Sequence, residues 1–214
     1  MALQKEDAAK YALLAMTAHR KKVRFEVDTT VGEAHDEVFL THLDDGSALV
    51  YIDGSDLDNT EEWKNNIQKW CGGDFGGAVA RIAQIIDEHV GAEKCILVGY
   101  SRGASIAVAV GALSKKETYV VTVGDPALAQ SNENNVTALT NQFDFVYGLC
   151  GIPTGEPTND GRRAPLVTSN ARWRRSGWKV WLDDVGRHMN YEQTLVDEAA
   201  QSRIQVDYAK EKKA

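Results

Sequence analysis

Apolar residues along this chain recur either at helical spacing or in short continuous runs. Near the start, Leu3, Tyr11, Leu14 and Ala18 fall roughly on one face of an amphipathic helix. Between residues 75 and 90 the pattern predicts a second helix with one buried face. Its apolar positions are Phe75, Ala78, Val79, Ile82, Ile85, Ile86 and Val90. Nearly all-apolar runs at 94–99 and 118–124 are typical of strands that are buried on both faces.

The segment between these two strands predicts a sharp turn that carries a nucleophile. It reads Gly99-Tyr100-Ser101-Arg102-Gly103, and residues 104–116 after it are rich in small side chains, as in a helix packed closely on a sheet. A serine raised at a strained strand-to-helix turn needs neighbours that are nearly free of side chain two positions away. The new helix also directs its first N–H groups at the site. We therefore predict that Ser101 is a catalytic nucleophile rather than an ordinary serine between two glycines.

A serine nucleophile needs a base, and the base needs an orienting carboxylate. In α/β-hydrolases the acid and then the histidine follow the serine along the chain, and of the five histidines only His188 follows Ser101. The alternative for His188 is a surface residue that caps the helix after it. Two acids compete: Asp144 stands among aromatic residues, where a carboxylate without a partner is costly, whereas Asp125 precedes Pro126 as a turn residue often does. We favour Asp144.

Length and composition limit the class of protein. The 214 residues suffice for one sizeable domain, which we expect to span residues 1–214, and the net charge of −7 argues against nucleic acid as a partner. No apolar run approaches the ~20 residues that span a bilayer. Lys5, Glu6 and Asp7 stand where a signal peptide would be apolar. Three cysteines without metal-binding spacing suggest unpaired thiols and a reducing compartment, so we expect a cytoplasmic protein.

Residues 148–177 form the least regular stretch, which we interpret as a long functional loop. Within it and at its end, tryptophans alternate with a group of arginines. The arginines are Arg162, Arg163, Arg172, Arg174 and Arg175. This loop is either solvated and paired with nearby acids, or a patch that binds a phosphate-bearing group or an anionic membrane. A role in binding single-stranded nucleic acid has weaker support, because no wider basic surface accompanies it.

With these residues assembled, the chain resembles the class 3 lipases, the family of fungal triacylglycerol lipases and feruloyl esterases. The match runs over residues 23–195 as an ordered set of motifs: an apolar strand ending in Gly54-Ser55, the turn around Ser101, an Asp-x-Val segment at residues 144–146, and a His-x-x-Tyr pattern at residues 188–191. The chain departs from the family at two positions. Tyr100 replaces a histidine before the nucleophile, and Tyr147 replaces a proline after the Asp-x-Val segment.

The resemblance implies an α/β-hydrolase fold, with a mostly parallel central sheet and helices on both faces. It implies Ser101, Asp144 and His188 as the catalytic triad, and Ser55 with the backbone N–H of Arg102 as the oxyanion hole. After Ser55, one helical face repeats apolar side chains at i, i+4 and i+7. These are Trp63, Ile67 and Trp70. In the family this region is a mobile lid; the alternative is a fixed helix that buries its tryptophans.

From sequence we therefore expect a serine esterase or lipase that works through an acyl-enzyme on a small-molecule or lipid ester, with transient contact to a lipid interface and with no metal or cofactor. One alternative is an acyltransferase or thioesterase with the same triad. The other is a non-catalytic binding protein of the same fold. The sequence indicates neither the acyl length nor the oligomeric state.

Overall fold

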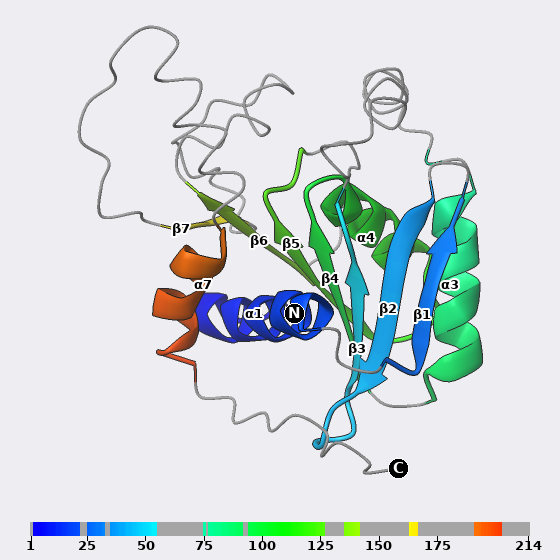
Figure 1. Cartoon of the computed structure of the whole chain (residues 1–214), viewed down its shortest axis with the longest axis horizontal. Helices are drawn as coiled ribbons and strands as arrows, with labels where there is room; N and C mark the ends of the chain where they lie inside the picture. The colour runs from blue at the N-terminus through cyan, green and yellow to red at the C-terminus, as the bar shows by residue number, and fades with distance from the viewer. Residues whose placement is uncertain are drawn as a thin grey trace, which may run out of the picture.

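The described part of the chain contains a seven-stranded sheet in which the strands lie in the order of the chain (Figure 1). The computed structural model describes residues 2–21, 25–32, 35–54, 75, 77–91, 94–126, 135–141, 163–166 and 191–202. The strands are β1 Val27–Val31, β2 Asp36–His42, β3 Ala48–Ile52, β4 Cys95–Tyr100, β5 Thr118–Val123, β6 Val136–Asn141 and β7 Arg163–Leu166. β1 to β3 pair antiparallel, and β3 to β7 pair parallel. The sheet is mostly parallel, as predicted.

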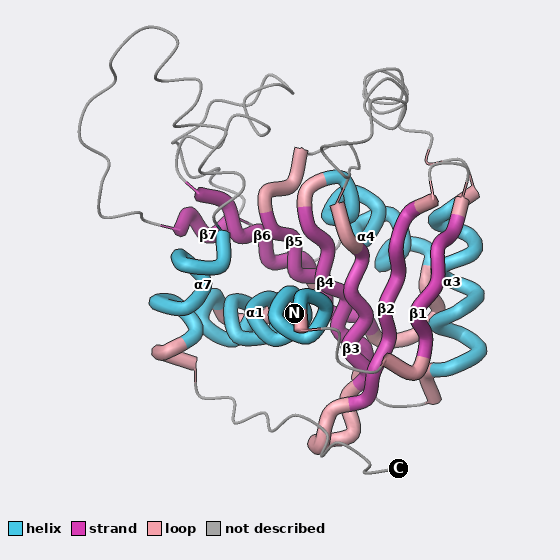
Figure 2. Tube along the Cα trace, in the orientation of Figure 1, coloured by secondary structure: helices cyan, strands magenta, loops and turns pink. Residues whose placement is uncertain are grey.

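Helices cover both faces of the sheet, which confirms the α/β class (Figure 2). They are α1 Lys5–Arg20, α3 Ala78–His89, α4 Arg102–Leu113 and α7 Tyr191–Ala199. Because side chains alternate along a strand, β3 directs Leu49 and Tyr51 into the core under α1 and α7. Val50 and Ile52 enter the second core, under α3 and α4. The two cores explain why β3 and β4 are apolar at almost every position.

α1 is more deeply buried than the sequence pattern indicated. Tyr11, Leu14 and Ala18 are buried as predicted, while Leu3 precedes the helix and packs against the same core. The helix also buries a set of small or flexible side chains that the predicted face omits. These are Ala8, Ala9, Ala12, Ala15 and Met16. The extra burial follows from the position of α1, which packs against both the sheet and α7.

The predicted elements on either side of Ser101 are confirmed. Phe75 and Val90 are both buried, but they flank α3 instead of belonging to it. Gly77 precedes the helix with a left-handed φ of 78°, which sets its start at Ala78. β4, α4 and β5 follow in the predicted order, and β3 is the apolar strand expected before Gly54.

The interpretation of residues 148–177 as one long loop is wrong for residues Arg163–Leu166, and the strands β1 and β2 were not predicted. Residues Arg163–Leu166 form β7, which pairs with β6 at the edge of the sheet. β7 is the last strand in the described order, and proline is tolerated in edge strands. β1 and β2 mix polar with apolar positions, so no long apolar run marks them. The other positions of the stretch, including Arg162 and residues 172–175, lie outside the described residues.

Two expectations concern compartment and membrane. None of the helices in the described ranges is both long enough and apolar enough to cross a bilayer. Cys95, on β4, is fully buried. Cys71 and Cys150 lie outside the described residues.

Candidate active site

Ser101 occupies the turn between β4 and α4 in a backbone conformation that L-residues rarely adopt. Its φ is 52° and its ψ is −122°. Its N–H donates a hydrogen bond of 2.9 Å to the carbonyl of Val123, on the neighbouring strand β5, and its own carbonyl accepts one of 3.0 Å from the N–H of Ala104. A non-glycine residue with such angles persists only when its surroundings hold it there, and such strain is concentrated at functional sites.

The two glycines around Ser101 are required by close backbone contacts. A Cβ on Gly99 would lie 2.3 Å from the carbonyl oxygen of Gly103. A Cβ on Gly103 would lie 2.3 Å from the oxygen of Ile52 and 2.4 Å from that of Asp53. Because each of these contacts is with backbone atoms, no flexible side chain can move aside to make room for the added Cβ. The Gly-x-Ser-x-Gly pattern therefore has the steric origin that the sequence analysis predicted.

The turn places Ser101 at the amino end of α4, where it is the N-cap residue. The N–H groups of a first helical turn have no acceptor inside their own helix, and the helix dipole makes this end partly positive. The first turn of α4 contains no acidic residue. Negative charge that develops on an oxygen beside Ser101 would be stabilised by this environment.

The side chain of Arg102 is committed to a buried ion pair. Its Nη1 lies 2.7 Å from Oδ1 of Asp36, and its Nη2 donates to Oδ2 at 3.1 Å. The two side chains are only 4% and 3% exposed. Asp36 is the first residue of β2, so this pair joins the beginning of α4 to the antiparallel part of the sheet. The carboxylate of Asp36 thereby balances the charge of the Arg102 guanidinium inside the protein. The group of Arg102 that the predicted oxyanion hole uses is its backbone N–H.

The end of β3 lies directly against the turn. A Cβ built on Gly54 would lie 3.0 Å from Cβ of Ser101 and 3.1 Å from Cδ1 of Tyr100. The ring of Tyr100 in turn meets that of Tyr191, the first residue of α7, edge to face at a centroid distance of 6.3 Å. The start of α7 and the end of β3 are therefore both close to Ser101.

Asp125, the second candidate for the acid, follows β5 and is half-buried. Its Oδ1 accepts a hydrogen bond of 2.7 Å from the hydroxyl of Ser105, which is fully buried in the first turn of α4. This bond joins the end of β5 to the helix after the nucleophile.

The remaining predicted site residues lie outside the described part of the chain. They are Ser55, Asp144 and His188, together with Trp63, Ile67 and Trp70 of the predicted lid. The structure therefore brings together Ser101, Arg102 and the Gly54 that precedes Ser55. The composition of the triad is a prediction that it does not test.

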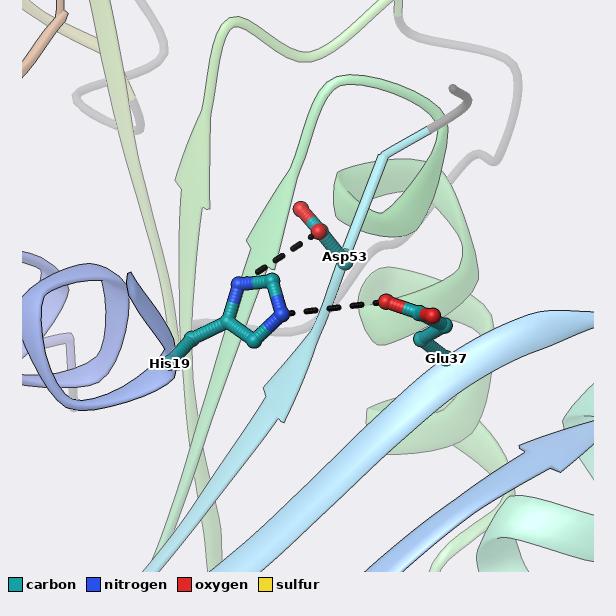
Figure 3. Close-up of side chains that lie close together, drawn as sticks. All are labelled: His19, Glu37 and Asp53. Atoms are coloured by element: carbon teal, nitrogen blue, oxygen red, sulfur yellow. Dashed lines mark ion pairs between the residues drawn. The ribbon is translucent and has the colours of Figure 1, made fainter. Parts of the chain in front are cut away.

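A polar cluster beside this site was missed by the sequence analysis. His19 in the last turn of α1, Glu37 on β2 and Asp53 after β3 direct their side chains at one another (Figure 3). His19 Nδ1 lies 3.5 Å from Oδ2 of Asp53, and His19 Nε2 lies 3.7 Å from Oε2 of Glu37. No local pattern reveals this cluster, because its members come from three separate elements.

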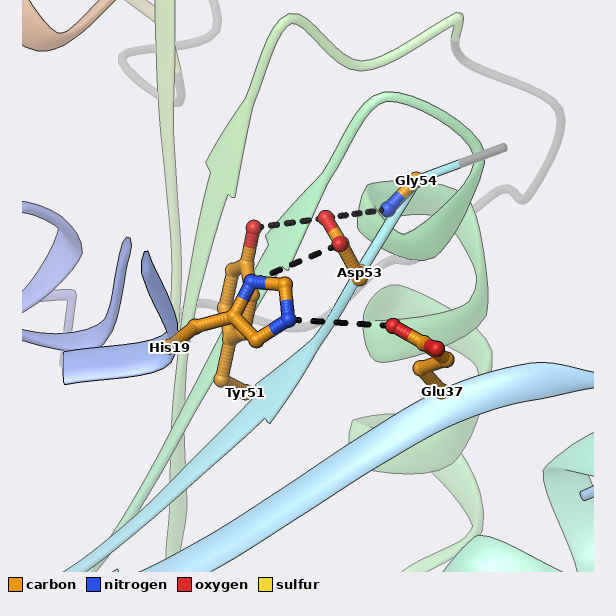
Figure 4. A network of polar contacts seen from close by, with 5 residues as sticks. All are labelled: His19, Glu37, Tyr51, Asp53 and Gly54. Atoms are coloured by element: carbon orange, nitrogen blue, oxygen red, sulfur yellow. Dashed lines mark hydrogen bonds and ion pairs between the residues drawn. The ribbon is translucent and has the colours of Figure 1, made fainter. Parts of the chain in front are cut away.

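Asp53 also anchors the end of β3. Its Oδ1 accepts hydrogen bonds of 2.8 Å from the Tyr51 hydroxyl and from the N–H of Gly54 (Figure 4). Burial, followed by the charge of Asp53, raises the pKa of Tyr51 well above its ordinary value of 10.0. The phenol therefore stays protonated and remains a donor to Asp53 through the neutral range.

The sequence matches no family model and no curated protein. Among solved structures, the chain is similar to M37 lipase, with 9% identity, a TM-score of 0.40, and coverage of 67% of this chain and 69% of that one. It is also similar to Lip2 lipase from Yarrowia lipolytica, with 12% identity, a TM-score of 0.44, and coverage of 72% and 77%. Both TM-scores are below 0.5, so neither similarity establishes an activity for this chain.

Proposed function

We propose that this chain is a serine hydrolase of the α/β-hydrolase type that cleaves carboxylic esters. The observation that carries the proposal is the left-handed backbone of Ser101, held at a strand-to-helix turn by two glycines that have no room for a side chain. An ordinary serine needs neither the strain nor the crowding. A nucleophile needs both, because they present its hydroxyl at the amino end of a helix.

In the proposed mechanism, His188 accepts the proton of Ser101 as its Oγ attacks the ester carbonyl carbon. The hydroxyl of Ser55 and the N–H of Arg102 stabilise the oxyanion, and Asp144 holds the tautomer of His188. The tetrahedral intermediate collapses to an acyl-enzyme, and the alcohol leaves with the proton from His188. Water then attacks the acyl carbon with the same base, which releases the acid and restores Ser101.

The topology of the sheet supports this set of residues. Ser101 directly follows β4, while Ser55 and Asp144 follow the last residues of β3 and β6 by three positions each. The carboxyl ends of parallel strands meet at one edge of a sheet, where α/β proteins bind their ligands. His188 precedes Tyr191 by three positions, and the ring of Tyr191 meets that of Tyr100 beside the nucleophile.

The nucleophile is tested with a fluorophosphonate probe and a series of p-nitrophenyl esters of increasing acyl length. The unaltered chain should be labelled and active, whereas Ser101→Ala should lose labelling and at least ~10³-fold in kcat/KM. Ser114→Ala, at the other end of α4, is the matched control and should keep both. A folded chain that neither reacts with the probe nor cleaves any ester would be a binding protein, and the proposal would be wrong.

The acid is tested by two matched substitutions. Asp144→Asn should lower kcat by at least ~10²-fold, because an amide stabilises the wrong tautomer of the histidine. Asp125→Asn should keep most of the activity and cost about 1 kcal/mol of stability, because Asp125 already accepts the hydroxyl of Ser105. Both variants are compared at equal folded fraction by circular dichroism. The opposite pattern would assign the acid to Asp125.

A further inference from the structure

The side chains of His19, Glu37 and Asp53 bring one imidazole and two carboxylates together on the face of the sheet that α1 covers (Figure 3). One potential ligand atom from each residue lies within 4.8 Å of the others. The three side chains are 29%, 52% and 25% exposed, so the cluster is open to solvent on one side. We propose that this cluster binds a divalent first-row transition-metal cation such as Zn²⁺.

The distances between the imidazole and the two carboxylates are too long for hydrogen bonds. The nitrogen-to-oxygen separations of 3.5 and 3.7 Å exceed the 2.7–3.2 Å of an ordinary N–H···O bond. Zinc binds nitrogen and oxygen at about 2.1 Å in tetrahedral geometry, so two of its ligand atoms lie about 3.4 Å apart. One imidazole nitrogen binds one ion, so both carboxylates must approach the same nitrogen. The three ligand atoms, which now lie within 4.8 Å of one another, have to close to about 3.4 Å, and the half-exposed side chain of Glu37 has room to move.

The ligand types select the class of ion. An imidazole nitrogen with two carboxylates suits Zn²⁺ and its first-row neighbours, whereas Ca²⁺ and Mg²⁺ prefer oxygen ligands alone. A metal-bound imidazole is neutral, so the two carboxylates would balance the charge of a divalent cation. Arg20, the cationic residue that follows His19 on α1, forms an ion pair with Glu192 of α7.

Two of the three ligands are already oriented by contacts around them (Figure 4). The Tyr51 hydroxyl and the Gly54 N–H bind one oxygen of Asp53, and the other oxygen faces the imidazole. The ring of His19 packs against the rings of Phe39 at 4.4 Å and Tyr51 at 5.4 Å. Outer contacts that fix the orientation of ligands are typical of metal sites.

A bound ion would join α1, β2 and β3 next to the turn that carries Ser101. Gly54 donates its N–H to the carboxylate of Asp53, and the same residue lies against Ser101. The site nonetheless stands apart from the proposed hydrolysis, because none of its three ligands takes part in that mechanism. Metal binding is therefore measured directly and not through activity.

The experiment titrates the chelator-treated full chain with Zn²⁺ by calorimetry and with Co²⁺ by visible absorption. We expect one saturable site whose affinity falls at least ~100-fold in His19→Gln and in Glu37→Gln, since losing a ligand costs more than losing an outer contact. Tyr51→Phe, which removes an outer contact, should lower the affinity about 10-fold. Glu37→Gln is a conservative change on a half-exposed strand position, so its folding should be unaffected.

The matched control is His42→Gln. His42 Nδ1 pairs with Glu26 at 2.8 Å, which is a hydrogen-bond distance, and no third ligand joins this pair in the described residues. The control should bind Zn²⁺ as the unaltered chain does. Equal binding by His19→Gln, Glu37→Gln and the unaltered chain would overturn the proposal. So would the absence of saturable binding, or a thiolate-to-cobalt charge-transfer band that assigns the ion to a cysteine.

Discussion

Asp36 and Glu37 are consecutive carboxylates of β2, yet they meet opposite environments. Because side chains alternate along a strand, Asp36 enters the core under α4, and Glu37 lies on the face covered by α1. Asp36 is buried in a tight pair with Arg102. Glu37 is half-exposed, and its nearest partner, His19, stands 3.7 Å away.

The contrast shows that exposure to solvent determines whether a carboxylate needs a close partner of opposite charge. Removing a charged group from water is costly, so a buried carboxylate must be matched completely, and Arg102 provides two nitrogens for the two oxygens of Asp36. A carboxylate in contact with water has no such requirement and is free to exchange partners. The buried pair therefore stabilises the fold, whereas the open cluster has a side that faces solvent.

The largest expected effect comes from neutralising the buried carboxylate of Asp36, compared with the half-exposed carboxylate of Glu37. Asp36→Asn leaves the guanidinium of Arg102 buried without its counter-charge, and it should lower the free energy of unfolding by about 3–5 kcal/mol. Glu37→Gln should change it by less than about 1 kcal/mol, because its partner is distant and solvent screens the charge. Urea denaturation at neutral pH measures both. Equal losses in the two variants would remove the distinction between the faces.

The next effect distinguishes the cost of crowding around an added Cβ from the cost of an unfavourable backbone φ. Gly103→Ala places a Cβ against the backbone oxygens of Ile52 and Asp53 and should cost about 3 kcal/mol, at the upper end of the range for overpacking. Gly46→Ala is the control, because Gly46 has a φ of 82° but nothing within 4 Å of an added Cβ. It should cost about 1 kcal/mol. If Gly103→Ala were the milder change, the turn would not be held by crowding.

The smallest effect concerns Tyr51 at high pH. Its folded-state pKa is raised, so the stability contributed by its protonated phenol is complete below pH 10 and is lost as the pH rises above 10. Tyr51→Phe should cost about 1–2 kcal/mol at neutral pH, because Asp53 loses a donor, and should make the alkaline decline shallower.

The control for this effect is Tyr119→Phe. Tyr119 donates to Glu117 at the surface, where solvent screens the interaction, so its removal should alter the alkaline decline less. Tyr11 contributes to the decline in both variants, because burial raises its pKa to about 12. Thermal unfolding followed between pH 8 and about 12 gives the comparison. Identical curves for Tyr51→Phe and the unaltered chain would argue against the bond to Asp53.

The turn at Ser101 could be predicted from sequence because the constraints on it are local. Gly99 and Gly103 lie within two positions of the serine, and the apolar runs of β4 and β5 identify the sheet around them. The two helices on either side were equally accessible, since each buries one face at helical spacing or is made of small residues. This part of the chain requires the absence of a side chain at crowded positions, and the sequence shows that requirement directly as glycines.

The cluster beside β3 could not be predicted for the opposite reason. Each member has an ordinary local explanation, because His19 lies in the last turn of a helix and Asp53 follows a strand. Glu37 belongs to a strand whose mixed polarity hides it. Their proximity depends on the packing of α1 across the sheet, which no local pattern contains. β7 escaped prediction similarly, because it is defined by backbone pairing with β6 and not by apolar side chains.

The position of α1 has a consequence for the order in which the chain can fold during synthesis. α1 is made before every strand that it covers, and its partner α7 is made after all of them. Its buried face must therefore wait while the rest of the chain is completed. Alanines dominate that face, and they favour the helix while exposing little apolar surface. The helix can form early, remain in water at low risk of aggregation, and dock when the sheet is complete.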